Sequence, residues 1–160
     1  MSSIKLRPAE ATDSEDLFTW ANNPLTRRMS FSSDPITHEQ HQDWFRRSME
    51  DRNRLIFMAA NEQGDSVGMV RIDRLNTDVA ELAINTAPAL RGRGYGADMI
   101  AAVCTRNDLG AQLFLARIKN GNVASIRAFK KAGFLEVITH DDLEKGRIVI
   151  MVKIAQNAGR

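Results

Sequence analysis

The sequence passes from a strand-like run to a helical run through Arg91-Gly92-Arg93-Gly94-Tyr95-Gly96-Ala97, where three glycines alternate with two arginines and a tyrosine. The run before it, residues 79–87, is apolar and ends at a proline, and residues 98–109 after it have helical spacing. Glycines at such a turn allow positive φ angles and let a ligand approach the main chain closely. The first turn of the helix adds unpaired N–H groups and a partial positive charge. The stretch therefore predicts a cradle for a phosphate or pyrophosphate group.

Two other interpretations of this stretch stay open. An Arg-Gly run can be a disordered arm that binds nucleic acid, and glycines can simply interrupt a loop. The structured runs on both sides argue against a disordered arm. The stretch also lacks the later glycine of a dinucleotide fingerprint and the lysine of a phosphate-binding loop. If it is a cradle, the arginines at positions 91 and 93 add mobile positive charge.

The composition is that of an ordinary globular protein. A length of 160 residues predicts a single domain, residues 1–160, with 43% apolar and 26% charged residues. The net charge of +2 is too small to favour nucleic acid or an anionic membrane as a partner. The single cysteine, Cys104, excludes an internal disulfide and a cysteine-based metal cluster, so we expect no metal. We find no signal peptide and no run of roughly 20 apolar residues, and therefore expect a cytoplasmic protein.

The order of predicted elements is that of a mixed α/β domain. Capping boxes at 12–15 and 37–40 predict helices that begin at Asp13 and after Thr37, with a polar loop at 25–35 between them. We expect a mainly antiparallel sheet of about seven strands with helices on both faces. The remaining predicted elements are strands at 4–9, 54–61, 67–75, 79–87, 113–119, 134–139 and 147–154, a helix at 98–109, and a short helix that ends at Gly133.

A second motif lies at 122–134, after the strand at 113–119. At 3.6 residues per turn, its polar residues Asn122 and Ser125 share one helical face with Phe129. Such a face, polar at its start and aromatic further along, is able to line a cofactor channel. The other interpretation is that Asn122 only caps the helix and that Phe129 only belongs to the core.

Both motifs resemble those of the GCN5-related N-acetyltransferases, the GNAT superfamily. The spacing Arg91-x-x-Gly94-x-Gly96 is similar to that family's signature for acetyl-coenzyme A. The second motif resembles its segment N-x-x-[AS]-x-x-x-[YF]-x-K-x-G-F, with lysines at both 130 and 131. The resemblance covers nearly the whole chain and implies the GNAT fold. It also implies that acetyl-CoA is the co-substrate and that an amine attacks its thioester directly, without an acyl-enzyme.

The resemblance implies a role for each group around the cofactor. Asn122 would hydrogen-bond the pantetheine arm, Ser125 would lie near the pyrophosphate, and a backbone N–H around 84–86 would stabilise the oxyanion. Phe129 stands where many relatives have a tyrosine that protonates the thiolate, so we name no general acid. A thiol pKa of about 8.5 makes thiolate a fair leaving group without one. The predicted cofactor-binding residues are Ile84, Asn85, Thr86, Arg91, Gly92, Arg93, Gly94, Tyr95, Gly96, Ala97, Asn122, Ser125 and Phe129.

The reaction needs a base to deprotonate the amine. Glu81 is the only carboxylate within the strand at 79–87, and the family resemblance also favours a glutamate there. A solvated or salt-bridged glutamate is the other interpretation of this residue. His38 and His41 are rival bases, although His41 lies on the face of Trp44 and fits a partly buried histidine as well.

The acceptor is predicted to bind the first half of the chain. Residues 20–30 and 36–45 are similar to GNAT enzymes that acetylate the 4-amino group of nucleotide-linked amino sugars in pseudaminic-acid-type pathways. They also share the first-helix pattern of ribosomal-protein N-terminal acetyltransferases. Arg27 and Arg28 would hold a sugar-nucleotide diphosphate, unless they are solvent-facing loop charges. The candidate substrate residues are Asn22, Arg27, Ser30 and His41.

Two hypotheses of other classes remain. The chain is a non-catalytic acyl-CoA-binding module if the cradle persists without chemistry, a hypothesis that rests only on Phe129. An RNA-binding protein that uses the Arg-Gly run would show steeply salt-dependent affinity, and the net charge disfavours it. We therefore expect a small-molecule amine or amino-sugar nucleotide as partner, with no nucleic acid and no membrane. A homodimer through the open edges of the sheet is left open.

Overall fold

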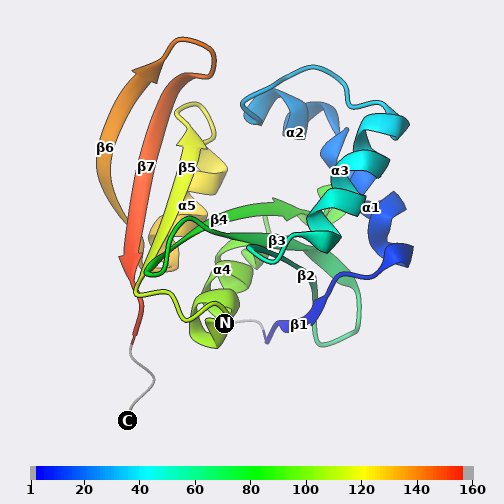
Figure 1. Ribbon diagram of the computed structural model, residues 1–160, viewed down its shortest axis with the longest axis horizontal. Coiled ribbons are helices and arrows are strands. Elements are labelled where there is room, and N and C mark those ends of the chain that lie inside the picture. The colour runs from blue at the N-terminus through cyan, green and yellow to red at the C-terminus, as the bar shows by residue number, and fades with distance from the viewer. Residues whose placement is uncertain (1–2, 157–160) are drawn as a thin grey trace.

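The computed structural model describes residues 3–156, so the two ends of the predicted 1–160 domain lie outside the described residues. Helices and strands follow the predicted order along the chain, with one helix more than the sequence indicated (Figure 1). The elements are β1 (Lys5–Pro8), α1 (Ser14–Ala21), α2 (Pro24–Met29), α3 (His38–Glu50), β2 (Arg54–Ala60), β3 (Ser66–Arg74), β4 (Val79–Thr86), α4 (Tyr95–Arg106), β5 (Leu113–Lys119), α5 (Val123–Lys131), β6 (Leu135–Asp142) and β7 (Gly146–Ile154).

The strands form one seven-stranded sheet in the order β1-β2-β3-β4-β5-β7-β6. Every neighbouring pair is antiparallel except β4 and β5, which run parallel. Helices α1 and α3 lie on one face of the sheet, and α4 and α5 lie on the other (Figure 1). The predicted fold class, a mainly antiparallel sheet with helices on both faces, is confirmed.

The parallel pair is short, and the two strands then separate. Pairing joins residues 79–81 of β4 only to residues 113–115 of β5. Beyond that point β4 continues along β3 as far as Thr86, while β5 continues along β7 as far as Lys119. On its β5 side, the last part of β4 therefore has no strand partner, and a gap opens in the middle of the sheet.

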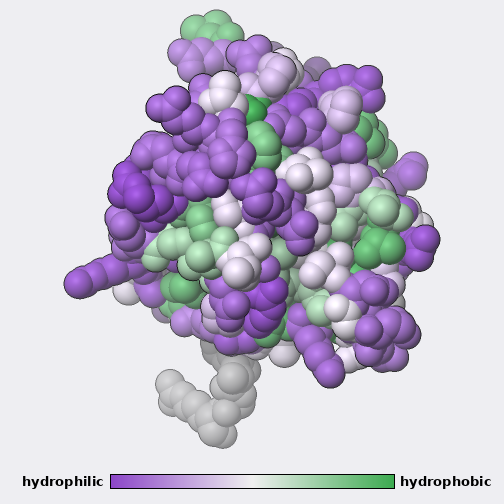
Figure 2. Space-filling model, turned by 90° about the vertical axis from the view of Figure 1, so that its right-hand side faces the viewer, coloured by the Kyte–Doolittle hydropathy of each residue, from purple (hydrophilic) through white to green (hydrophobic). Residues whose placement is uncertain are grey.

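Two apolar cores lie on opposite faces of the sheet. The larger one packs α4 and α5 onto the strands and includes the fully buried side chains of Met99, Phe114 and Phe134. The smaller one packs α1 and α3 onto β2 and β3 through Trp20 and Phe45. Burial of each such side chain contributes about 1.5–3 kcal/mol to folding. The outer side of α1 and α3 is mostly hydrophilic, with small separate apolar areas (Figure 2).

The start of α1 differs from the prediction. A 3-10 turn at Ala11–Asp13 precedes it, and the capping box joins Glu10 and Asp13 rather than residues 12–15. The carboxylate of Asp13 also accepts two hydrogen bonds from Arg7, at 2.7 and 2.8 Å. That ion pair draws Asp13 into the preceding turn, so the predicted box does not form. The second predicted box, between Thr37 and Gln40, is confirmed at the start of α3.

The predicted loop at 25–35 is wrong for its first half, which forms helix α2. Pro24 occupies the first turn of α2, where its fixed φ suits a helix and its missing N–H costs nothing. The side chain of Asn23 caps this turn by accepting from the N–H groups of Leu25 and Thr26. Helix α2 therefore begins almost directly after α1 ends at Ala21.

Candidate active site

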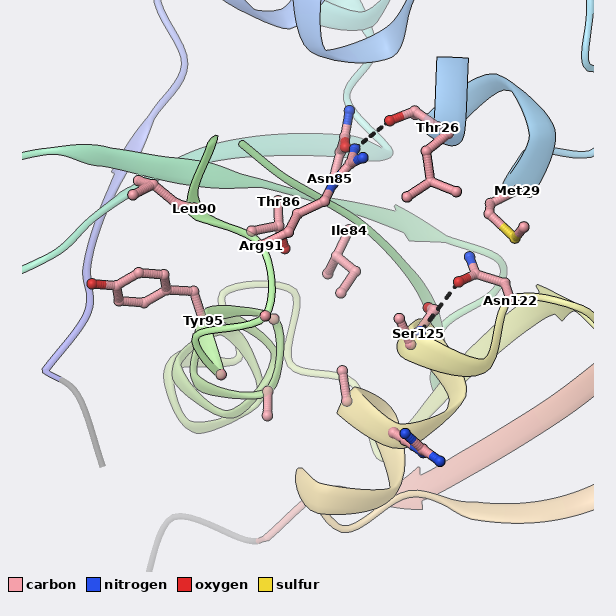
Figure 3. A pocket seen from close by; sticks show the side chains of 18 of the residues that line it. Thr26, Met29, Ile84, Asn85, Thr86, Leu90, Arg91, Tyr95, Asn122 and Ser125 are labelled. Atoms are coloured by element: carbon pink, nitrogen blue, oxygen red, sulfur yellow. Dashed lines mark hydrogen bonds between the residues drawn. The ribbon is translucent and has the colours of Figure 1, made fainter. Parts of the chain in front are cut away.

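A cavity of about 430 Å³ lies where the glycine turn, the end of β4, α2 and α5 meet (Figure 3). It adjoins the gap at which β4 and β5 separate. Its lining consists of Leu25, Thr26, Met29, Ser30, Ile84, Asn85, Thr86, Leu90, Arg91, Gly92, Gly94, Tyr95, Gly96, Ala97, Asn122, Ala124, Ser125, Arg127, Ala128 and Lys131. Most of the residues predicted to bind the cofactor are therefore brought together around one space.

The glycine turn presents free backbone donors at this cavity. Gly92 and Gly94 have φ angles of +76° and +85°, which L side chains rarely adopt, and α4 begins directly after Gly94. The first backbone hydrogen bond of the helix runs from the N–H of Asp98 to the carbonyl of Gly94. Among residues 3–156, the N–H groups of 92–97 donate no hydrogen bond to another backbone group. They and the positive end of the helix dipole are available to an anion.

Gly96 keeps the cavity open between α4, α5 and β4. A Cβ atom at this position would lie 3.3 Å from the Cβ of Ala128 and 3.4 Å from Cδ1 of Ile84. The same packing shows that Ile84 points toward α4, so its neighbour Asn85 points to the opposite face of the sheet. Ile84 and Asn85, at the end of β4, therefore project from opposite faces of the sheet.

The two arginines of the turn lie in different surroundings. Arg91 lines the cavity, but its guanidinium donates to the side-chain oxygens of Asn23, at 3.0 Å, and of Thr26 (Figure 3). Burial lowers the pKa of Arg91 from its usual value. Arg93 is exposed and does not line the cavity. Arg91 therefore connects the turn to α2 in this structure, and phosphate binding by either arginine stays a prediction.

Helix α5 supplies the opposite wall. The side chain of Asn122 caps it by accepting from the N–H of Ser125 at 3.2 Å, which is the interpretation that the sequence left open, and both residues line the cavity. Phe129, in contrast, is 1% exposed and packs edge-on against Phe134, with ring centroids 4.9 Å apart. Phe129 thus belongs to the core and does not line the cavity, so its predicted contact with the cofactor is corrected.

Sequence reasoning missed the two cations that α5 adds. Arg127 and Lys131 line the cavity one turn apart, and Nζ of Lys131 lies 3.8 Å from the position that a Cβ would take on Gly94. They occupy neighbouring positions of the helix surface, as residues four apart do. The two lysines near the end of the second motif were the signal for this cationic wall. Residues of α2 were missed as well, because that segment was predicted to be a loop.

Glu81 is salt-bridged, the other interpretation that the sequence allowed. Its two carboxylate oxygens accept hydrogen bonds of 2.9 and 2.8 Å from the guanidinium of Arg117. Those bonds, together with the charge of Glu81, raise the pKa of Arg117. Glu81 is 8% exposed and does not line the cavity. Because Glu81 ends the paired part of β4 and Arg117 lies on β5, the ion pair bridges the two strands where they separate.

Two of the four candidate substrate residues, Asn22 and Arg27, form hydrogen bonds within the first helices and the loop that follows them. The amide of Asn22 exchanges two hydrogen bonds of 2.8 Å with the main chain of Ile36. The guanidinium of Arg27 donates to backbone carbonyls at 21, 32 and 34 and to the hydroxyl of Ser30. Burial lowers the pKa of Arg27. These two side chains are engaged within the fold, and of the predicted set only Ser30 lines the cavity.

The two histidines near α1 lie outside the cavity. His41 is 2% exposed, and its Nε2 lies 2.8 Å from the carbonyl oxygen of Ser14, an acceptor, so Nε2 carries the proton. Burial lowers the pKa of His41. His38 is more than half exposed and pairs with Glu15 at 2.7 Å. His41 is therefore a buried histidine, as the other interpretation of the sequence allowed. Neither histidine lines the cavity.

Across residues 3–156 no helix combines the length and the apolar character that crossing a bilayer requires.

Comparisons with known proteins agree with this geometry. The sequence model of the acetyltransferase (GNAT) domain matches residues 3–135, and the chain belongs to that family. It is 30% identical over 139 residues to the uncharacterized protein MJ1062 of Methanocaldococcus jannaschii, covering 83% of this chain but only 28% of that protein. It is 28% identical over 140 residues to YwnH of Bacillus subtilis, by its name a candidate phosphinothricin acetyltransferase, covering 83% of this chain and 85% of YwnH.

The fold also matches solved structures. Spermidine N-acetyltransferase from Vibrio cholerae, determined in complex with CoA and spermine, superposes with a TM-score of 0.83 at 17% identity, covering 95% of each chain. At that identity the likeness establishes the fold. The expected resemblance to the GNAT superfamily is confirmed by the family match, whereas the finer likeness to sugar-nucleotide or ribosomal-protein acetyltransferases is not.

Proposed function

We propose that this chain transfers the acetyl group of acetyl-CoA to a primary amine of a small molecule. One observation carries the proposal: the unpaired N–H groups of 92–97 and the gap between β4 and β5 border a single cavity. The pyrophosphate of the cofactor fits the amides and the helix dipole. With Ser125 near the pyrophosphate, the pantetheine arm then runs along α5 past Asn122, and the thioester reaches the end of β4.

The rate enhancement follows from position and from backbone donors. Holding the amine against the thioester turns a bimolecular step into an effectively unimolecular one. The end of β4 lacks a strand partner on its β5 side, so an N–H around Ile84 to Thr86 is our candidate for the oxyanion donor. The amine nitrogen forms a bond to the acetyl carbon, the carbon–sulfur bond breaks, and CoA leaves as thiolate. The amine's proton passes to a base.

Glu81 remains our candidate for that base. It is supported by its strand position on the face of β4 that carries Asn85. Because Arg117 engages both of its carboxylate oxygens and Glu81 lies outside the cavity lining, a water molecule has to relay the proton. We name no general acid, since Phe129 is buried in the core and the leaving thiolate is stable enough without one.

The identity of the acceptor is a separate proposal. The proposal of a nucleotide-linked amino sugar rests on the likeness of residues 20–30 and 36–45 to GNAT enzymes that acetylate such sugars. It also rests on the exposed Arg28, because Arg27 is engaged within the fold. The V. cholerae relative holds spermine, a small polyamine, which favours a small-molecule acceptor over a protein N-terminus. An N-terminal peptide is the rival acceptor, and a non-catalytic acyl-CoA-binding module is the rival function.

The test measures binding and turnover separately. Acetyl-CoA is expected to raise the melting temperature of the purified protein, and free thiol is expected to appear only when an amine is added. The amine panel contains an amino-sugar nucleotide, N-terminal peptides and small amines. A melting shift with no thiol from any amine would support the binding module, and the absence of any shift would overturn the proposal.

A further inference from the structure

A cluster of charged side chains lies on the sheet face that carries Asn85, outside the residues that line the cavity. We call Arg54, Arg71, Asp73, Glu81 and Arg117 the arginine cluster. Arg54 donates to both carboxylate oxygens of Asp73, at 2.6 and 3.2 Å, and Arg117 does the same to Glu81. The pKa of Arg117 responds to the charge of Asp73 as well as to that of Glu81, so both ion pairs share one electrostatic environment.

The cluster holds one positive charge that no carboxylate neutralises. It contains three guanidinium groups and two carboxylates, and Asp73 is shared between Arg54 and Arg71. Nε of Arg71 lies 3.0 Å from Oδ2 of Asp73, but it is buried without a hydrogen bond to any acceptor. Within the described part of the chain the terminal amino groups of Arg71 have no partner either. The Arg71 side chain is 29% exposed, so a ligand can reach it.

The register places Arg71 close to the reacting end of the cofactor site. Arg71 is opposite Ala83 on β4, and Met69, two residues earlier, is opposite Asn85. Residues two apart in a strand share a face and lie about 7 Å from each other. Arg71 and Asn85 therefore project from the same face, one strand and about 7 Å apart along the strands. No hydrogen bond within the described residues occupies the side-chain amide of Asn85, which lines the cavity.

We propose that Arg71 binds an oxyanion of the acceptor, so that the acceptor is a small primary amine carrying a carboxylate or phosphate group roughly 7 Å or less from its nitrogen. This inference rests on the proposed acetyl transfer and names its substrate class. A guanidinium suits both groups because its planar donors match two oxyanion oxygens at once. The excess positive charge of the cluster also disfavours polyamines, which would bring like charge to a half-buried cation.

The test uses acceptor pairs that differ only in the anionic group. Free thiol release is measured at fixed acetyl-CoA with α-amino acids and their amides, with glucosamine 1-phosphate and glucosamine, and with spermidine. The anionic member of at least one pair is expected to have a kcat/KM about tenfold or more above its neutral partner. The pair that shows this preference tells a carboxylate acceptor from a phosphate acceptor.

Variants then assign the preference to Arg71. Arg71→Gln should bring the anionic-to-neutral ratio close to one by lowering kcat/KM for the anionic acceptor alone, and Arg71→Lys should retain part of it. Arg52→Gln, at an exposed turn, is the control and should leave the ratio unchanged. If Arg71→Gln unfolds the protein, the Lys variant carries the test, because Arg54 still pairs with Asp73.

The outcomes separate the inference from the proposed function. Thiol release that favours the neutral amines or spermidine overturns the inference and leaves acetyl transfer standing. A ratio that Arg71→Gln and Arg71→Lys both leave unchanged also overturns it. Release of free thiol in the absence of any added amine overturns both the inference and the proposed function.

Discussion

Arg91 in the glycine turn donates a hydrogen bond to the hydroxyl of Thr26 in α2. The same guanidinium also bonds the Asn23 side chain that caps α2. Helix α2 therefore takes its position from the turn that is proposed to hold the cofactor, and both elements line one cavity. A substitution in the glycine turn is therefore expected to change acceptor binding through this connection.

Arg91→Gln should weaken the acceptor side more than the cofactor side. Loss of hydrogen bonds from a charged donor costs about 1.5–3 kcal/mol, so the variant should melt earlier and show a raised KM for the amine. Arg93→Gln is the matched control, because Arg93 is exposed and outside the cavity lining. Steady-state kinetics with each substrate varied in turn measure the difference. A raised KM for acetyl-CoA with an unchanged KM for the amine would mean that Arg91 is a phosphate ligand after all.

Gly94→Ala should damage cofactor binding beyond its effect on stability. An L residue at φ +85° is strained by about 1–2 kcal/mol, and this residue lies directly before the start of α4. Gly64→Ala, at φ +87° in the turn between β2 and β3, carries the same strain at a residue outside the cavity lining. Both variants should lose similar free energy of unfolding, and only Gly94→Ala should raise the Kd for acetyl-CoA in a calorimetric titration. Equal Kd values in both variants would remove the turn from the cofactor site.

The role of Glu81 is separated from that of its ion pair by changing each partner. If Glu81 is the base, Glu81→Gln should lower kcat by about 10²–10⁴-fold. Arg117→Gln breaks the same ion pair but leaves the carboxylate, so its kcat should fall far less. Both are measured across pH, with melting temperatures to account for the shared loss of stability. Similar small losses of kcat in the two variants would make Glu81 a structural residue.

The burial of His41 predicts that the folded protein becomes less stable as the pH falls. Burial lowers the pKa of His41 in the folded protein below its usual value of 6.5, so the unfolded chain takes up the proton first as the pH falls. The free energy of unfolding should therefore decrease as the pH drops below about 6.5, and His41→Gln should flatten the curve in this window. His38→Gln, at a residue more than half exposed, is the control and should keep the slope. Urea titrations at several pH values provide the measurement.

Cys104 should not interfere with thiol assays. Burial raises the pKa of the Cys104 thiol to about 11, so it stays protonated and shielded at neutral pH. A disulfide reagent should react slowly with the native protein at pH 8 and should titrate one thiol after denaturation. Fast reaction of the native protein would contradict the burial of this residue.

Local patterns predicted the strands and the glycine turn that borders the cavity. The alternation and the turn signals placed β5 at the observed residues 113–119, and the glycine spacing placed the turn before α4. These features depend on contacts between neighbours in the sequence, which a pattern can encode. The helix that follows the turn begins at Tyr95 rather than 98, because Gly94 itself supplies the left-handed cap.

The contacts that the sequence did not reveal join residues that lie far apart along the chain. Arg91 bonds residues of α2, and Glu81 bonds Arg117 of β5. A family motif marks such positions without stating which contact each side chain makes. Arg71 belonged to no motif, and its excess charge became visible only when the register brought β2, β3 and β4 together.

A crystal structure with acetyl-CoA bound is the most direct measurement. We predict the pyrophosphate oxygens within hydrogen-bond distance of the backbone N–H groups of 92–97, with the thioester carbonyl at the end of β4 beside its gap to β5. A cofactor whose pyrophosphate lies away from those amides, or whose thioester lies outside that gap, would contradict the account.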